Sequence, residues 1–186
     1  TSAAYHLSQE GLSVALAEAR TLAESASGRN AGFLLQGTAE RYSRAVSLMG
    51  HEKAKRVHAW SLENHERMSQ AISQFGIPCN YQKRGSLQLA GSPEEEAELR
   101  LSAELLTSDG FQANLLSKSQ LPDALQDAGF EMGVHLPDDG ELDPALFVKN
   151  IGSIAAQQGA RIFESTPVLE LNAQTPGDVY ARCTDG

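Results

Sequence analysis

Residues 13–35 read SVALAEARTLAESASGRNAGFLL. The first five form a short apolar run that predicts a buried strand, and the acid Glu18 follows it directly. In doubly wound α/β domains, a carboxylate just beyond such a strand accepts hydrogen bonds from ribose hydroxyls. The small-residue and glycine loop at 25–32 lets its backbone approach a ligand and offers N–H groups to an anion. The pattern favours a nucleotide-cofactor site, although a strand, an acid and a polar loop also occur in α/β proteins that bind no nucleotide.

The residues before this stretch predict the second half of a βαβ unit. Residues 1–10 are expected to form a helix whose apolar side carries Ala3, Ala4 and Leu7 and which stops at Gly11. A complete unit needs about 30 residues and a glycine-rich G-x-G-x-x-G turn about 20 residues ahead of the acid. That motif does not occur in the sequence, and the chain begins without Met. We therefore expect a fragment of a longer protein.

The bulk composition excludes several classes of partner. The chain has 186 residues, 41% hydrophobic and 21% charged, with a net charge of −9, which is typical of a soluble globular protein of one domain or one domain with an inserted lobe. This acidity argues against nucleic acid as a partner. Cys79 and Cys183 are far apart, so they predict reduced thiols in a cytoplasmic protein rather than zinc or disulfides. The sequence shows neither a membrane-spanning apolar run nor a signal peptide.

Two helices are predicted at 37–49 and 51–75, separated by Gly50. The apolar side of the second helix, expected to face the core, carries Val57, Trp60, Met68, Ile72 and Phe75. Three histidines on this helix, His51, His58 and His65, are seven residues apart. That spacing is about 10.5 Å along a helix, too far for two of them to share one metal ion, so we interpret them as surface or boundary residues. No metal site is expected.

The rest of the chain alternates between helices and strands. A helix is expected from the N-cap Ser92 to 108 and another from the N-cap Asp143 to 158, each with proline at its first position. Strands are expected at 81–90, 111–116, 130–135, 160–164, 167–171 and 178–183. A short helix broken around Pro122 is expected at 117–127, and Asp138 and Asp139 are interpreted as turn residues at 136–140.

Three segments resemble a known family. They are E-A-R at 18–20 with S-G-R-N-A-G at 27–32, P-D-D-G-E-L-D-P at 137–144, and G-A-R-I-F-E-S-T-P-V at 159–168. In this order they resemble the FAD-dependent amine and amino-acid oxidoreductases of the D-amino-acid oxidase, glycine oxidase and sarcosine oxidase superfamily. The likeness is greatest to members similar to γ-glutamylputrescine oxidase, and it extends over most of the chain.

The resemblance implies FAD as the cofactor and assigns residues to it. Glu18 would bind the ribose hydroxyls of the adenosine, with Ala19 and Arg20 beside the adenine and ribose. Val168 would present its backbone to the adenine edge. The loop along the pyrophosphate and ribityl chain would consist of Ser27, Gly28, Arg29, Asn30, Ala31 and Gly32.

The resemblance also implies a fold and a reaction. The fold is α/β (α+β overall), with a partial FAD-binding Rossmann-like domain at 1–36 and 143–186 and an inserted substrate-lobe segment of helices and antiparallel strands at 37–142. The protein would oxidise a C–N bond of a small amine or amino acid by hydride transfer to the flavin. Hydride transfer from a neutral amine needs no acid–base pair, so no catalytic residue is assigned, and the oligomeric state is left open. The alternative is a truncated, non-catalytic α/β fragment that acts as a structural or interaction module.

Overall fold

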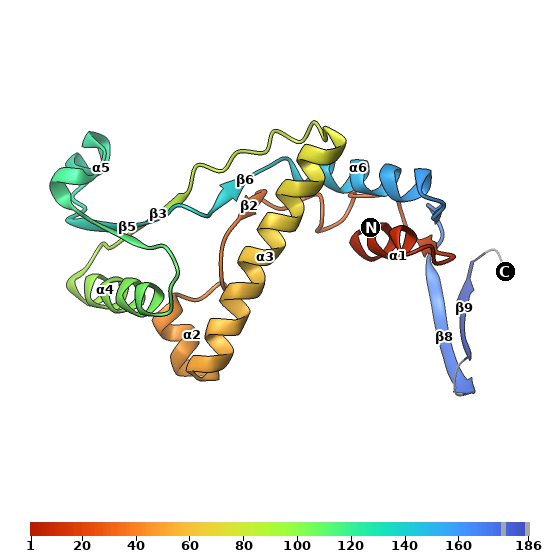
Figure 1. Ribbon diagram of the computed structural model, residues 1–186, viewed down its shortest axis with the longest axis horizontal. Coiled ribbons are helices and arrows are strands. Elements are labelled where there is room, and N and C mark those ends of the chain that lie inside the picture. Colours follow the sequence, from red (N-terminus) through yellow and green to blue (C-terminus); the bar gives the residue numbers. More distant parts are fainter. Residues whose placement is uncertain (176–177, 185–186) are drawn as a thin grey trace. The chain divides into compact units, whose positions relative to one another are not determined.

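The computed structural model describes residues 1–175 and 178–184, so positions 176–177 and 185–186 of the predicted segment 143–186 lie outside the described residues. The chain forms two compact units, coloured by sequence in Figure 1. Unit 1 consists of Thr1–Gly32, Ile77–Cys79 and Asp143–Gly186, and unit 2 of Phe33–Gly76 and Asn80–Leu142. Within the described part of the chain, no helix is both long enough and apolar enough to cross a membrane.

Unit 1 is built around one parallel strand pair. Strand β1 (Ala15–Ala17) pairs in parallel with β7 (Arg161–Phe163), with Leu16 opposite Ile162. Helix α1 (Ser2–Gln9) packs against α6 (Pro144–Gln157), and Figure 1 shows them side by side in red and blue. Strands β8 (Val168–Thr175) and β9 (Asp178–Cys183) form an antiparallel hairpin. Parallel strands need a crossover connection, and here the chain between them ends in α6, which directly precedes β7.

Helix α6 begins where the sequence predicted. The carboxylate of Asp143 accepts a hydrogen bond from the N–H of Leu146 (2.9 Å), and Pro144 occupies the first turn. These contacts satisfy one of the donors that a helix start leaves unpaired, and the ring of proline fixes the backbone angle that the first turn needs.

Unit 1 also departs from two expectations. A strand forms within the predicted segment, but it begins at Ala15 rather than at 13, and its predicted burial is wrong because the side chains of Ala15 and Ala17 are exposed. Helix α1 buries Ala4 as predicted, but Tyr5 and Ser8 are buried in place of Ala3 and Leu7. The reason is that the hydroxyl of Ser8 turns inward to the carbonyl of Tyr5 and to the side chain of Gln158 at the end of α6.

Unit 2 combines helices with antiparallel strands, as predicted for this part of the chain. Its main sheet has the order β3 (Ser86–Leu89), β5 (Met132–Leu136), β4 (Asn114–Ser117), and a second pair joins β2 (Phe33–Leu34) to β6 (Gly140–Glu141). The helices are α2 (Tyr42–Met49), α3 (His51–Phe75), α4 (Pro93–Ser108), α5 (Asp123–Asp127) and the 3-10 turn η1 (Lys118–Gln120). The core lies between α2, α3, α4 and the central strand β5 and contains Tyr42, Ala45, Ala54, Ala90, Leu99, Ala103, Leu106, Met132, Val134 and Leu136.

Helix α2 starts five residues later than predicted. The hydroxyl of Thr38 accepts a hydrogen bond from the N–H of Glu40 (3.2 Å), and the N–H of Gly37 donates to the hydroxyl of Ser61 on α3 (2.6 Å). These side-chain contacts replace the helical hydrogen bonds of residues 37–41. Strands β2 and β6, two residues each, were not predicted because two residues are too few to show an alternation.

The prediction that Trp60 of α3 faces the core is wrong, because Trp60 is 58% exposed. The buried residues of α3 are Ala54, His58 and Ala71. The guanidinium of Arg56 lies 5.1 Å from the centre of the Trp60 ring, so the indole packs against a charged neighbour on the same helix.

One carboxylate joins three helices of unit 2. Asp109, at the end of α4, accepts a hydrogen bond from the hydroxyl of Tyr42 on α2 (2.6 Å). It also pairs with His51 (2.9 Å) and Lys55 (3.3 Å) on α3. Burial raises the pKa of this carboxyl, but the hydrogen bonds from His51, Tyr42 and Lys55 outweigh burial and lower the pKa to about 2.

From the contacts of Asp109 with Tyr42, His51 and Lys55, we predict that the protein is less stable in acid. Because the folded-state pKa lies below the ordinary value near 4, its stabilisation is complete above pH 4 and is lost as the pH falls towards 2. Asp109→Asn should lower the free energy of unfolding by about 1–3 kcal/mol at neutral pH and by little near pH 2. Urea unfolding across this range measures the difference.

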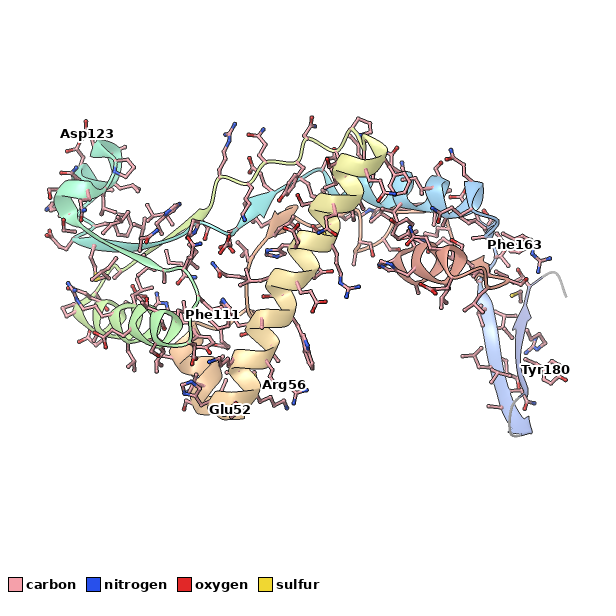
Figure 2. The ribbon with its side chains drawn as sticks, viewed as in Figure 1. Glu52, Arg56, Phe111, Asp123, Phe163 and Tyr180 are labelled. Carbon is pink, nitrogen blue, oxygen red and sulfur yellow. The ribbon has the colours of Figure 1, made fainter. Side chains whose placement is uncertain are left out.

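Asp123→Asn is the matched control, since Asp123 is an exposed residue at the start of α5 (Figure 2). A destabilisation by Asp109→Asn that stays constant between pH 7 and pH 2 would contradict the role given to this carboxylate.

Candidate functional sites

Two main-chain hydrogen bonds connect Glu18 to the end of β7 and to the residues that follow it. Its N–H donates to the carbonyl of Phe163 (2.9 Å), which Figure 2 labels, and its own carbonyl accepts from the N–H of Thr166 (2.8 Å). One carboxylate oxygen accepts a hydrogen bond from the N–H of Arg20 (3.0 Å). A carboxylate has about four acceptor positions, so Glu18 retains capacity for the hydroxyls of a ligand.

The next residues are held by Glu164, a role that the sequence did not suggest. The side chain of Glu164 accepts a hydrogen bond from the N–H of Leu22 (2.7 Å), and the carbonyl of Arg20 accepts from the N–H of Ser165 (2.7 Å). The side chain of Leu22 lies over Gly152 of α6, where a Cβ would collide with it. Glu164 belongs to the quoted segment 159–168, so a motif match marked the residue but not its function.

Asn30 organises the small-residue loop. Its side-chain amide donates to the carbonyls of Ala26 and Ser27, both at 3.0 Å. Its side-chain oxygen accepts from the N–H of Gly32 (2.9 Å). The side chain therefore closes the loop on itself and fixes its course without a ligand.

Gly28 is required by close packing within the same loop. A Cβ at this position would overlap the carbonyl oxygen of Ala23. The N–H groups of Gly28 and Arg29 donate to the carbonyls of Ser25 (3.0 Å) and Ala26 (3.3 Å). These two donors are thus engaged inside the loop, and an anion would have to be met by other N–H groups.

A pocket of about 190 Å³ in unit 1 brings two of the predicted residues together. Its polar lining comes from Glu18, Ser25, Ser27 and Thr1, the residue that precedes α1. The apolar lining comes from Leu16, Ala17, Leu22, Ala23 and Val148. Thr1 was not predicted to line a site with the acid.

The other predicted cofactor residues lie around this pocket rather than in its lining. Ala19, Arg20, Arg29, Asn30 and Ala31 are exposed. Gly28 is half-buried and Gly32 is buried in the loop itself. Val168 is the first residue of β8, where it pairs with Cys183.

The donor set of this pocket fits the ribose end of a dinucleotide. A carboxylate and three hydroxyl groups offer the acceptors and donors that sugar hydroxyls need. The residues present would therefore suit the adenosine part of FAD, with Glu18 on the ribose.

Unit 2 contains a second and larger pocket, of about 350 Å³. Three of its lining residues form a buried polar chain that the sequence did not predict: Gln36, His58 and Asp139 are 7%, 3% and 2% exposed. The carboxylate of Asp139 accepts from the backbone N–H of Gln36 (2.8 Å) and from the hydroxyl of Ser86. Asp139 is thus more than the turn residue that the sequence indicated.

His58 corrects a second interpretation, since it is buried rather than a surface or boundary residue. Its ring lies 5.2 Å from that of Tyr42 and 4.3 Å from that of Phe111, which is labelled in Figure 2. Its Nε2 is 2.9 Å from the side-chain oxygen of Gln36. Burial lowers the pKa of His58 to about 4, so the imidazole is neutral at pH 7.

No group of three or more His, Cys, Asp or Glu side chains within residues 1–175 and 178–184 could hold a metal ion. His51 instead pairs with Asp109, and His65 lines a small polar pocket beside Tyr81 and Lys83.

The whole chain matches one protein family. The family model described as FAD dependent oxidoreductase covers residues 1–186. The chain belongs to this family. The match confirms the resemblance inferred from residues 18–20, 27–32, 137–144 and 159–168.

Individual relatives agree with this assignment. The chain is 26% identical over 172 residues to a probable oxidoreductase OrdL of Haemophilus influenzae, covering 91% of this chain and 40% of that protein. It is 25% identical over 183 residues to gamma-glutamylputrescine oxidoreductase of Escherichia coli, covering 96% and 42%. The structure of glycine oxidase from Bacillus cereus superposes with a TM-score of 0.71 at 20% identity, covering 100% of this chain and 48% of that one. The chain therefore has part of the glycine oxidase fold and spans less than half the length of these relatives.

The burial of His58 predicts a second dependence of stability on pH, in a pH range different from that of Asp109. Because its folded-state pKa of about 4 lies below the ordinary 6.5, the unfolded state binds more protons between these values. The free energy of unfolding should fall by about 2–3 kcal/mol as the pH drops from 6.5 to 4. His58→Gln, which cannot titrate, should abolish most of this slope in urea unfolding.

His6→Gln, which changes an exposed histidine of α1, is the control and should keep the slope of the unchanged protein. Equal slopes in the two variants would show that His58 does not control this pH range.

Proposed function

We propose that the protein carrying this chain oxidises a C–N bond of a small amine or amino acid by transferring hydride to FAD. The observation that carries the proposal is the position of Glu18. This residue directly follows a parallel strand, and both its N–H and its carbonyl form main-chain hydrogen bonds. It also lines a pocket together with side chains that carry hydroxyl groups. When bound, FAD supplies the hydride acceptor.

The residues of this chain would bind and orient the nucleotide rather than move protons. Glu18 would accept hydrogen bonds from the ribose hydroxyls, with Ala19 and Arg20 beside the adenosine and the backbone of Val168 at the adenine edge. Residues 27–32 would follow the pyrophosphate and ribityl chain, with Asn30 holding the loop in shape through its contacts to Ala26 and Gly32.

The division of the chain into two compact units supports a different function for each unit. We assign 1–36 and 143–186 to FAD binding and 37–142 to the substrate lobe. The bounds of units 1 and 2 fall close to these values. The names of two relatives, gamma-glutamylputrescine oxidoreductase and glycine oxidase, support an amine as the substrate class.

The test is flavin reduction in the protein expressed from its whole gene. Glycine and γ-glutamylputrescine are added without oxygen, and the flavin absorption band at about 450 nm is followed. We expect an amine to bleach this band, whereas glycolate, which replaces the amine of glycine by a hydroxyl, should leave it unchanged. Bleaching by glycolate but not by amines would contradict C–N oxidation, and a protein that takes up no FAD would contradict the cofactor.

A further inference from the structure

The pocket of unit 2 has the size and lining of a small-molecule site. Its volume of about 350 Å³ lies within the range of known ligand pockets. Buried apolar side chains from α4 and β5 form much of its wall: Leu99, Ala103, Leu106, Val134 and Leu136. The irregular segment 37–41, which replaces the expected start of α2, forms another part of the lining.

One polar atom in this wall lacks a partner. Among the described residues, the side-chain nitrogen of Gln36 is buried without a hydrogen bond. Two other polar groups of Gln36 are engaged, because its backbone N–H donates to Asp139 and its side-chain oxygen lies 2.9 Å from Nε2 of His58. A buried donor left unpaired is unfavourable, so an acceptor that entered the pocket would gain a hydrogen bond that the protein alone does not make.

The neighbours of Gln36 hold its side chain in place. With the amide oxygen towards the ring, that oxygen accepts from Nε2 of His58, which carries the proton in that tautomer. Gly37, with a φ of 80°, leads the backbone past the ring of His58, and a Cβ there would come within 2.9 Å of Nδ1. Gln36 and His58 are therefore held together by the backbone as well as by their hydrogen bond.

The charges around the pocket select against an anion. Its lining contains two acids, Glu40 and Asp139, and one base, Arg41. Arg41 is already bound to Glu98 on α4 at 2.7 Å. A carboxylate ligand would thus lie near acidic side chains with no unpaired base to receive it.

We propose that this pocket binds an uncharged small molecule with an apolar body and a carbonyl oxygen, and that the side-chain N–H of Gln36 donates to that oxygen. None of the residues that line this pocket belongs to the loop at 25–32, and the proposal does not depend on the proposed oxidation.

Matched six-membered rings test the proposal on the chain as it stands. Cyclohexanone carries the carbonyl, methylenecyclohexane is its hydrocarbon isostere, and cyclohexanecarboxylate is the anion. Affinities are measured by nuclear magnetic resonance titration of the ¹⁵N-labelled chain. Gln36→Met keeps the shape of the side chain but removes the donor, and Gln112→Met changes an exposed glutamine as the control.

The informative quantity is the preference for cyclohexanone over methylenecyclohexane, because the hydration of each probe cancels between protein variants. Gln36→Met should reduce this preference roughly fivefold, as expected for the loss of one hydrogen bond, and Gln112→Met should leave it unchanged. In the unchanged protein, cyclohexanone should also shift the side-chain amide signal of Gln36, and it should bind more tightly than the carboxylate.

Three results would overturn the proposal: an unchanged preference in a folded Gln36→Met, tighter binding of the carboxylate, or no binding of cyclohexanone. If Gln36→Met does not fold, the side-chain amide signal of Gln36 in the unchanged protein tests the contact instead. Cyclohexanone that binds without moving that signal refutes the contact with Gln36.

Discussion

The parallel pairing of β1 with β7 is the constraint on which unit 1 depends. It joins two strands from opposite ends of the chain and aligns Leu16 with Ile162. The two main-chain bonds of Glu18 to Phe163 and Thr166 continue this alignment beyond the strand ends. The acid is therefore positioned by backbone hydrogen bonds, which do not depend on the identity of neighbouring side chains. Its carboxylate is restrained as well, by the hydrogen bond from the N–H of Arg20, so it would lose less conformational freedom on binding a ligand than an unrestrained side chain.

The same alignment determines where the loop after Glu18 lies. Glu164 receives the N–H of Leu22, and Leu22 packs over Gly152, so the residues that follow β7 and the face of α6 together position 19–24. Residues 25–32 then depend mainly on their own contacts, through Asn30 and the close approach at Gly28. The pocket that contains Glu18 and Ser27 thus results from one long-range pairing and one self-contained loop.

Structural features that depend on neighbouring residues could be predicted from the sequence, whereas contacts between distant segments of the chain could not. Both N-caps, Ser92 and Asp143, were predicted because a capping side chain acts within three residues of its own position. The burial of His58 was missed, because helical periodicity gives its side of α3 but not the segments that cover that side. Trp60 was misplaced for the same reason, since an apolar residue on a helix is buried only where another element reaches it. Likewise, the residue type of Asp139 is common in turns, which led to its interpretation as a turn residue. Its contact with Gln36 joins residues far apart in the sequence and forms only in the folded chain.

The claim that Glu18 holds the adenosine ribose of FAD is tested most directly by removing the hydroxyls that it would bind. The affinity of the whole-gene protein is measured for FAD and for an FAD analogue whose adenosine lacks the 2′ and 3′ hydroxyls, with Glu18 present and in Glu18→Ala. We expect the analogue to bind roughly 10- to 100-fold more weakly than FAD when Glu18 is present, and about equally in Glu18→Ala. The same preference for FAD in both proteins would show that Glu18 does not bind the ribose.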